Sequence, residues 1–458
     1  MSEYIKEKKF RSHTWLAWLS VGMLVANVYH NKLLAILFPF FSSQLAVIML
    51  IGSVFLFVFY FFLDGHVRLS DLQFTEIDYA FLLAAVVILA TSGGDSENLT
   101  YFVRFFSLFV FMLFMKYDEK MIKIVFICLL IAGIIHVAAT LFFYFDQDFY
   151  LKYIYPTFSA DEQEKLYFWN IVNGYATGFA GHFSRNGIYT SVALLVSSLL
   201  LYTKNKKHRI LFAVLTLVSL IALIMTSKRA PLVFAVFAIA ATYILCAKTT
   251  PLSKLGIIAL AVIGSAVIIY IASFNIESIG VSFERFLSTF NKSDTNDVSN
   301  GRFKLYGVAW DYFLSAPIFG IGWREFSKRV VVFFNEDTYF RDTHNVFLQL
   351  LCETGIVGII IFLCLFALVL FLSVRLLIKV KRGELQISET ARFGLIFSIT
   401  AQIFFLSYSM TENPLYDLET FYLYAFAIGF VSTVWFRYEK LPIIEKIRSE
   451  KEKSIYIK

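Results

Sequence analysis

Two apolar runs decide the fold class of this sequence. Residues 45–63 read LAVIMLIGSVFLFVFYFFL and residues 356–372 read IVGIIIFLCLFALVLFL, and neither run contains a charged residue. A helix of about 20 apolar residues is long enough to cross the hydrocarbon core of a bilayer, which is about 30 Å thick. The strands of a membrane β-barrel would instead alternate apolar and polar residues. These runs therefore predict membrane-spanning helices.

The composition of the whole chain favours the same class. Of its 458 residues, 58% are hydrophobic and 16% are charged, whereas soluble domains average about 45–50% and about 25%. Phe alone supplies 52 residues, while Pro supplies 7 and Gly 22. This composition excludes a soluble enzyme, a disordered chain and a fibrous protein.

Apolar stretches of spanning length recur along the chain. They predict an all-α polytopic membrane protein with about 12 transmembrane helices and two long extracytoplasmic loops, the second of which contains short amphipathic helices. The sequence shows no internal repeat and no Walker, Rossmann or zincin motif. The predicted spans are 15–37, 44–63, 77–91, 100–115, 121–145, 187–203, 210–226, 231–247, 255–273, 346–374, 393–410 and 420–436.

The distribution of basic residues predicts the orientation. If both termini are cytoplasmic, most of the 41 Lys and Arg residues fall in cytoplasmic segments. Most of the others lie in the two long loops, where charge has little influence on insertion. The N-terminal residues Lys6, Lys8, Lys9 and Arg11 are interpreted as part of an uncleaved signal anchor that meets lipid headgroups and not nucleic acid.

This topology divides the chain into five parts. Long loops in a compact protein usually carry function, so the two outward loops are the first places to look for a site. The parts are a cytoplasmic basic N-terminus (1–14), helices one to nine (15–273, with an outward loop at 146–186), a large extracytoplasmic loop (274–345), helices ten to twelve (346–436) and a cytoplasmic basic tail (437–458).

His344 is the strongest candidate for chemistry, because it stands where the second loop enters the tenth span. A neutral imidazole can accept a proton near neutral pH. Asn345, Gln349 and Glu353 follow at helical spacing and are expected on one face, roughly 100° from His344. Asn345 and Glu353 are candidate substrate-binding residues, and contact between helices is the alternative role of all three polar residues.

Two cations precede the eighth span. Lys228 and Arg229 stand just before Pro231, where positive charges oppose both the helix macrodipole and the positive-inside trend. We therefore expect an anion there, since helix N-terminal amides and a guanidinium form a phosphate or diphosphate site. Arg302 begins the amphipathic part of the second loop. The alternative role of these cations is contact with lipid headgroups or a salt bridge.

The first loop supplies two weaker candidates. Arg185 and His182 lie in the Gly-rich, polar segment 173–186. A sugar could approach the backbone closely in such a segment, so both residues are candidate substrate contacts.

Neither a metal site nor a disulfide is predicted. The acidic residues Glu336, Asp337 and Asp342 lie near His344, but they lack the spacing of metal ligands, and no other cofactor is indicated. The four cysteines fall in or beside apolar runs and are interpreted as packing thiols. They are Cys128, Cys246, Cys352 and Cys364.

Four motifs occur in order between residues 226 and 358. They are Thr226-Ser227-Lys228-Arg229-Ala230-Pro231, Gly301-Arg302 leading to Trp310, Ala316-Pro317-Ile318-Phe319-Gly320-Ile321-Gly322, and His344-Asn345 with Leu348 and Glu353-Thr354-Gly355-Ile356-Val357-Gly358. The ordered set resembles the O-antigen ligase and polymerase superfamily, the WaaL- and Wzy-type integral membrane glycosyltransferases. The number of spans and the large loop before the tenth span are also similar to this family.

The resemblance implies an inverting, metal-independent glycosyltransferase in the cytoplasmic (inner) membrane of a bacterium, active on the extracytoplasmic side. Its donor would be a polyprenyl-diphosphate-linked glycan, held by Arg229 and Arg302, while His344 activates the acceptor. Lys228 stands where small residues are commoner in the family. The implied partners are this donor, a glycan or lipid-linked acceptor, the lipid bilayer and a chain-length regulator protein, but no nucleic acid.

Within the superfamily, residues 181–187 (GHFSRNG) look more like polymerases of O-antigen or capsular polysaccharide than like ligases. The alternative is a WaaL-like ligase that transfers polymer to lipid A core or another acceptor. A lipid-linked oligosaccharide transporter is a less favoured alternative. A transporter would place ionisable groups near the middle of its spans and show related halves, whereas the polar groups here lie at the outer ends.

Overall fold

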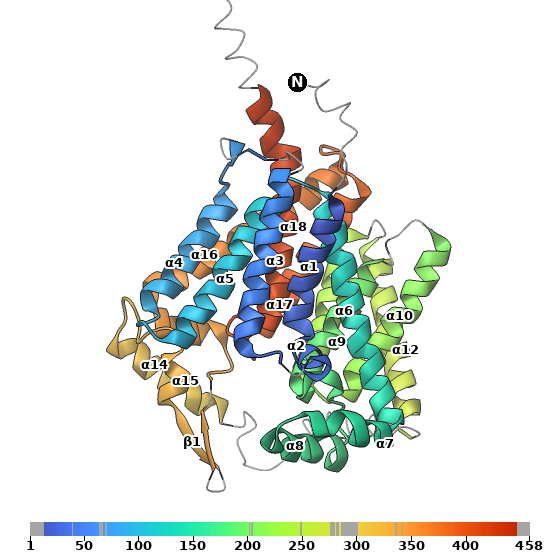
Figure 1. The fold of residues 1–458 in the computed structure, drawn as a ribbon. Coiled ribbons are helices and arrows are strands. Elements are labelled where there is room, and N and C mark those ends of the chain that lie inside the picture. The colour runs from blue at the N-terminus through green and yellow to red at the C-terminus, as the bar shows by residue number, and fades with distance from the viewer. Residues whose placement is uncertain are drawn as a thin grey trace, which may run out of the picture.

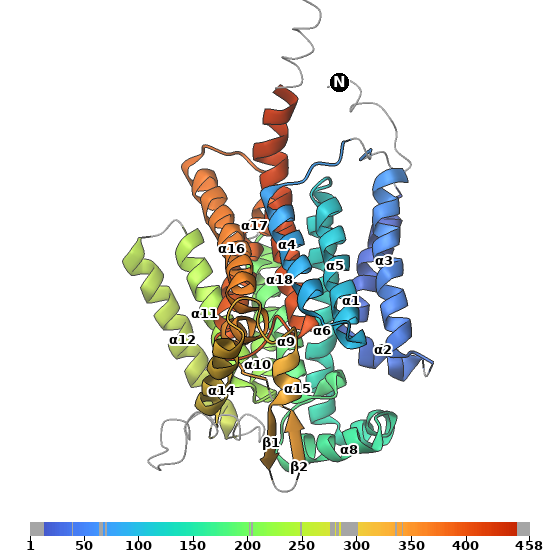
Figure 2. The same ribbon diagram turned by 90° about the vertical axis from the view of Figure 1, so that its left-hand side faces the viewer.

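In the structure, a computed structural model, each predicted span after the first coincides with one helix. The structure describes residues 13–38, 40–63, 67–68, 71–200, 202, 205–247, 250–274, 280, 284, 301–334, 337–340 and 342–446. The helices form one bundle (Figures 1 and 2). The helices at the twelve predicted spans are α1 (Thr14–Tyr29), α3 (Ser43–Leu63), α4 (Glu76–Thr91), α5 (Ser96–Met115), α6 (Lys120–Phe145), α9 (Phe183–Leu200), α10 (Lys206–Met225), α11 (Arg229–Cys246), α12 (Pro251–Ser273), α16 (Val346–Arg382), α17 (Glu389–Tyr408) and α18 (Leu418–Trp435).

Helix length and hydropathy establish a polytopic membrane protein. Within the described residues, 8 helices are long and apolar enough to cross a membrane. This confirms the predicted fold class. The predicted first span is divided, because α1 ends at Tyr29 and His30 leaves the helical conformation (φ −122°, ψ 21°) before α2 (Asn31–Leu37) begins. Figure 1 shows α2 turned away from α1.

Short elements gather at one end of the bundle, which we call the loop face (Figure 1). The start of α1 and the end of α18 lie at the opposite end (Figure 1). An antiparallel hairpin, with Val331 opposite Phe340, was not predicted, because its strands have only 4 residues each. The loop-face elements are α7 (Gln147–Phe149), η2 (Tyr150–Ile154), η3 (Tyr155–Thr157), α8 (Ala160–Leu166), η4 (Tyr167–Val172), η5 (Gly178–Ala180), α14 (Arg302–Ser315), α15 (Glu325–Arg329), β1 (Val331–Phe334) and β2 (Asp337–Phe340); η6 (Phe436–Lys440) extends α18.

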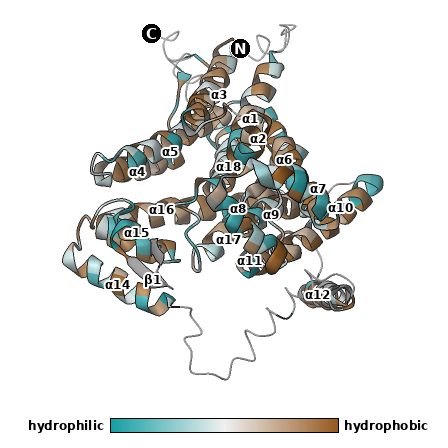
Figure 3. Cartoon of the chain, turned by 60° about the horizontal axis from the view of Figure 1, so that its bottom comes forward, coloured by the Kyte–Doolittle hydropathy of each residue, from teal (hydrophilic) through white to brown (hydrophobic). Residues whose placement is uncertain are grey.

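α18 forms the centre of the bundle. Every residue from Thr420 to Trp435 is buried, and the helix packs against α17, α5 and α16. At the periphery, α3 leaves Ile48 and Phe55 63% and 67% exposed, as expected for side chains that face lipid. Figure 3 shows hydrophilic residues (teal) on α8 and α15, while much of the bundle is hydrophobic (brown).

Backbone hydrogen bonds join the turn after α14 to a break inside α16. The break is at Gly355, whose φ of 64° and ψ of −167° are not helical. The N–H of Ile356 donates to the carbonyl of Pro317 (2.9 Å), and the N–H of Ile321 donates to that of Cys352 (2.9 Å). These bonds fix the position of α14 on α16.

Two glycines allow this close approach. A Cβ at Gly320 would lie 2.2 Å from the carbonyl carbon of Glu353, and one at Gly355 would lie 2.3 Å from the carbonyl oxygen of Ile318. Both glycines have positive φ, which a residue with a side chain rarely adopts. We call residues 316–322 and 352–358 the glycine clamp. It explains why the third motif and the glutamate–glycine part of the fourth occur together.

All four cysteines are free thiols; Cys246 and Cys352 are buried, as expected of packing thiols, whereas Cys128 is half-buried and Cys364 is exposed. Several predicted features lie outside the described residues. These are Lys6, Lys8, Lys9, Arg11, residues 275–300 of the large predicted loop except 280 and 284, Glu336 and the side chain of Asp337.

Candidate active site

A carboxylate that sequence reasoning missed lies at the centre of the candidate site. Glu412 lies in the connection between α17 and α18. Its carboxylate oxygens pair with Lys228 Nζ at 2.7 Å, Arg302 Nη2 at 3.4 Å and His344 Nδ1 at 3.0 Å. Its side chain is 13% exposed, whereas that of His344 is 33% exposed. We call these four residues the Glu412 cluster. It brings together three of the predicted site residues.

Three helices begin at this cluster. Lys228 is the N-cap of α11, Arg302 is the first residue of α14, and His344 directly precedes Asn345, the N-cap of α16. Arg229 is the first residue of α11, so it stands at the same helix start as Lys228. Unpaired N–H groups and the macrodipole make helix starts positive. The combination of helix starts and cations therefore favours an anionic ligand.

The conformation of His344 is unusual for a residue with a side chain, because its φ is 55°. Its neighbours hold it. The N–H groups of Phe347 and Leu348 donate to Asn345 Oδ1 (3.0 and 3.1 Å), and Thr343 Oγ1 donates to the carbonyl of Asn345 (2.7 Å). Ser227, next to Lys228, also has a φ of 55°. Left-handed non-glycine residues of this kind cluster at functional sites.

The pairing with Glu412 fixes the role of each ring nitrogen of His344. Burial alone would raise the pKa of Glu412, but the hydrogen bond to His344 and the charge of Lys228 lower it to about 2. The carboxylate is therefore ionised near neutral pH and can only accept hydrogen bonds. It accepts from Nδ1–H, so the lone pair of a neutral imidazole lies on Nε2. That nitrogen can take a proton from a substrate.

The segment before Glu412 is bound to the same helix starts. Arg302 Nη1 donates to the carbonyl of Thr411 (2.8 Å), Asn345 Nδ2 donates to that of Met410 (3.3 Å), and the N–H of Val346 donates to that of Ser409 (2.9 Å). Asn345 thus caps α16 and also holds the segment before Glu412 against the start of that helix. Whether it also touches substrate stays a prediction.

Arg185 and His182 belong to the segment that reaches the cluster at Gly187. Arg185 Nε is 3.4 Å from Glu419 Oε2, and a Cβ at Gly187 would lie 3.1 Å from Lys228 Cβ. His182 Nδ1 accepts a hydrogen bond from the N–H of Ser184 (3.0 Å). Burial, and then the charges of Arg185, Lys228 and Lys165, lower the pKa of His182 to about 4. His182 is therefore neutral at physiological pH.

Glu353 is not part of the Glu412 cluster. Its fully buried carboxyl group accepts hydrogen bonds from the N–H groups of Arg324 (2.8 Å) and Phe326 (3.1 Å) and from Gln349 Nε2 (3.1 Å). These bonds hold the turn between α14 and α15. Of the predicted polar stripe, Gln349 and Glu353 share a helix face, whereas Asn345 precedes the helix as its cap.

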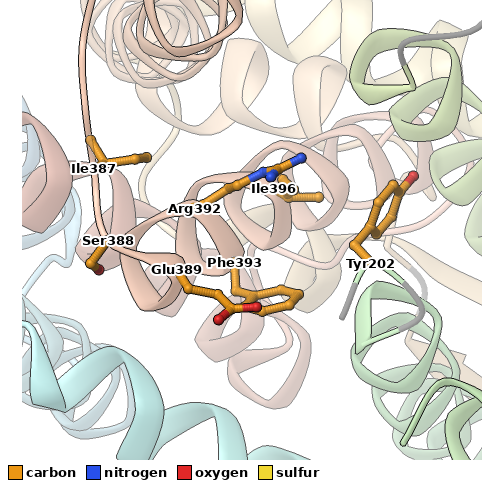
Figure 4. A pocket seen from close by; sticks show the side chains of 7 residues that line it. All are labelled: Tyr202, Ile387, Ser388, Glu389, Arg392, Phe393 and Ile396. Atoms are coloured by element: carbon orange, nitrogen blue, oxygen red, sulfur yellow. The ribbon is translucent and has the colours of Figure 1, made fainter. Parts of the chain in front are cut away.

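A cavity of about 140 Å³ lies far from this cluster, beside the start of α17. Because Glu412 follows the other end of α17, the 20 residues of that helix separate the two, a distance of about 30 Å. The cavity is lined by Tyr202, Ile387, Ser388, Glu389, Arg392, Phe393 and Ile396 (Figure 4).

Among the residues that the structure describes, no three His, Cys, Asp or Glu side chains are arranged to hold a metal ion.

The fold and the cluster define an integral membrane protein with a cationic site and a candidate base at one end of its helices. Residues 214–363 match the family described as O-antigen ligase. This stretch, 150 of the 458 residues, is similar to the O-antigen ligase and polymerase superfamily, which confirms the resemblance. The match includes Lys228, Arg229, Arg302 and His344 and ends before Glu412. No curated protein matches the chain.

Proposed function

We propose that this protein is a glycosyltransferase that uses a polyprenyl-diphosphate-linked oligosaccharide at the extracytoplasmic face of the bacterial cytoplasmic membrane. One observation carries the proposal: His344, Arg302 and Lys228, from three different helix starts, converge on Glu412 at the loop face. A donor diphosphate needs clustered cations and helix N-termini. An acceptor hydroxyl needs a base.

In the proposed reaction the acceptor hydroxyl loses its proton to His344 Nε2. The acceptor oxygen then forms a bond to C1 of the donor sugar while the bond from C1 to the diphosphate oxygen breaks. Polyprenyl diphosphate leaves with the electron pair, and attack from the opposite side inverts the anomeric centre. Arg302, Arg229 and Lys228 stabilise the charge that develops on the leaving group.

Glu412 acts on this reaction through its neighbours. It orients the imidazole through Nδ1 and stabilises the imidazolium that forms when Nε2 takes the proton, as a carboxylate does in other acid–base sites. It also holds Lys228 and Arg302 near His344. Arg185 and His182, whose segment reaches the cluster, are proposed contacts for the sugars.

Polymerisation of repeat units is the activity we favour, because the segment 181–187, which looks more like polymerases than like ligases, lies beside the cluster. Ligation of finished polymer to an acceptor is the alternative. The test is to isolate the cell-surface glycan from a deletion strain. A single repeat unit on the core indicates a polymerase, and full-length glycan retained on polyprenyl diphosphate indicates a ligase. Repeat units trapped on the cytoplasmic leaflet would instead indicate a transporter, and a normal surface glycan would contradict the proposal.

A further inference from the structure

α14 contacts the rest of the protein through one side. Leu305 and Ala309 are 5% and 1% exposed and belong to a buried cluster with Phe326 and Cys352. Arg302 projects toward the protein on this side, where it meets Glu412. These positions leave the remaining circumference of α14 open to its surroundings.

A second side of α14 is apolar and exposed. Gly307, Trp310 and Leu314 recur at intervals of three and four residues and so form one stripe along the helix. Trp310 is 49% exposed and Leu314 is 59% exposed. After the helix ends, Ile318 and Phe319 continue the exposed apolar surface with 56% and 68% exposure. Tyr306 and Phe313, which lie toward the protein side of the helix, are partly buried.

A third side of α14 is exposed and mostly polar, although it also carries Val308, which is 36% exposed. Lys304, Asp311 and Ser315 are all exposed, and their positions lie about 100° around the helix from the apolar stripe. The helix therefore has a protein side, an apolar side and a polar side. This is the pattern of a helix that lies in the plane of a membrane interface and packs against a membrane protein.

The apolar stripe is continuous with the lipid-facing surface of α16. The N–H of Val357 donates to the carbonyl of Ile318 (3.3 Å), and from there Val357, Ile360 and Leu363 are 38%, 51% and 43% exposed. Ile318 thus adjoins the loop-face end of this band. Figures 1 and 2 both show α14 across the loop-face ends of the neighbouring spans.

We propose that α14 is an in-plane membrane helix whose Gly307, Trp310 and Leu314 stripe, with Ile318 and Phe319, lies in the lipid leaflet at the loop face. Its apolar side enters the boundary between headgroups and acyl chains by about 5–10 Å. The polar side faces water. Arg302, at the start of the same helix, then stands at headgroup depth, where a lipid-linked anion presents its charge.

The test measures side-chain surroundings in the full chain reconstituted in liposomes. Spin labels are attached to Trp310→Cys and Leu314→Cys and, as matched controls, to Lys304→Cys and Asp311→Cys, each in a background without the four native cysteines. We expect labels at 310 and 314 to be relaxed by oxygen, which concentrates in lipid. Labels at 304 and 311 should be relaxed by a water-soluble nickel chelate.

Two outcomes would overturn the proposal. Equal relaxation by the nickel chelate at all four positions would place the stripe in water, and protection from both reagents at 310 and 314 would place it against a second protein copy. A second measurement avoids the cysteine background: lipids brominated near the carbonyls should quench more fluorescence of the wild-type chain than of Trp310→Phe. Neither measurement depends on glycosyltransferase activity, so this test is separate from that of the proposed function.

Discussion

His344 combines a proton-accepting ring with a backbone that few residues adopt, so its replacement tests the chemistry directly. His344→Ala should lower the transfer rate by about 100- to 10,000-fold, the usual contribution of a general base. The wild-type rate should fall on acidification, because a general base must be unprotonated to accept the hydroxyl proton. Because the pKa of Glu412 is lowered to about 2, that carboxylate stays ionised over the same pH range and does not cause the fall.

The measurement is a pH–rate profile of purified protein with lipid-linked donor. His344→Gln should retain weak activity without the acid limb, and His208→Gln, an exposed histidine at the start of α10, is the matched control. A His344→Gln protein with the wild-type rate and the same acid limb would show that another residue is the base.

Glu412→Gln should keep the shape of the side chain but remove the charge that orients His344 and holds Lys228. Loss of a hydrogen bond to a charged group, about 1.5–3 kcal/mol, should reduce kcat by about 10- to 100-fold. The donor KM should not rise, because the site becomes more positive for an anionic donor. Glu384→Gln, an exposed carboxylate between α16 and α17, serves as the control. A raised KM with unchanged kcat would instead mean that Glu412 contacts the donor.

Sequence reasoning found the donors of the Glu412 cluster but not Glu412 itself. His344, Arg302 and Lys228 each mark a helix start, which local patterns reveal. Glu412 stands in a short connection between two spans, and only the packing of α17 and α18 against the other helices brings it to them. The sequence signalled Glu412 only as a polar residue close to the end of a predicted span.

At the scale of elements, the glycine clamp determines where α14, and with it Arg302, stands relative to α16. Gly320→Ala and Gly355→Ala should each abolish activity and lower the thermal midpoint by several degrees, because a Cβ would overlap backbone atoms at 2.2 and 2.3 Å. Gly307→Ala is the control, since nothing lies within 4 Å of its Cβ position; replacing a helical glycine there should be neutral or stabilising by up to about 1 kcal/mol. Wild-type stability of Gly320→Ala would contradict the clamp.

The spans were predictable and the clamp was not, for one physical reason. Each span is encoded by its own apolar residues, so helices such as α3 and α16 follow from local sequence. The clamp is formed by backbone groups of residues 316–322 and 352–358, and hydropathy does not report which glycines meet. The β1–β2 hairpin escaped prediction because strands of 4 residues give too short a pattern.

For the whole molecule, the proposed reaction needs no resident metal, because the diphosphate is already a good leaving group and arginines can stabilise its charge. Transfer by purified protein should therefore continue in EDTA and without added nucleotide, which an assay of lipid-linked product can measure. Loss of activity in EDTA, with recovery on adding a divalent cation, would point to a metal-assisted mechanism.

The side of the membrane on which the loop face lies decides where the enzyme meets its substrates. With both termini in the cytoplasm, Ala160 in α8 should be extracytoplasmic, while Lys206 and Lys381 should be cytoplasmic; all three positions are exposed. Cysteine at each position, in a background without the native thiols, can be labelled in intact cells with an impermeant reagent. Position 160 should react at once and positions 206 and 381 only after lysis. Labelling of 206 in intact cells would place the Glu412 cluster in the cytoplasm, where nucleotide-activated sugars and not translocated lipid-linked glycans would be the available donors.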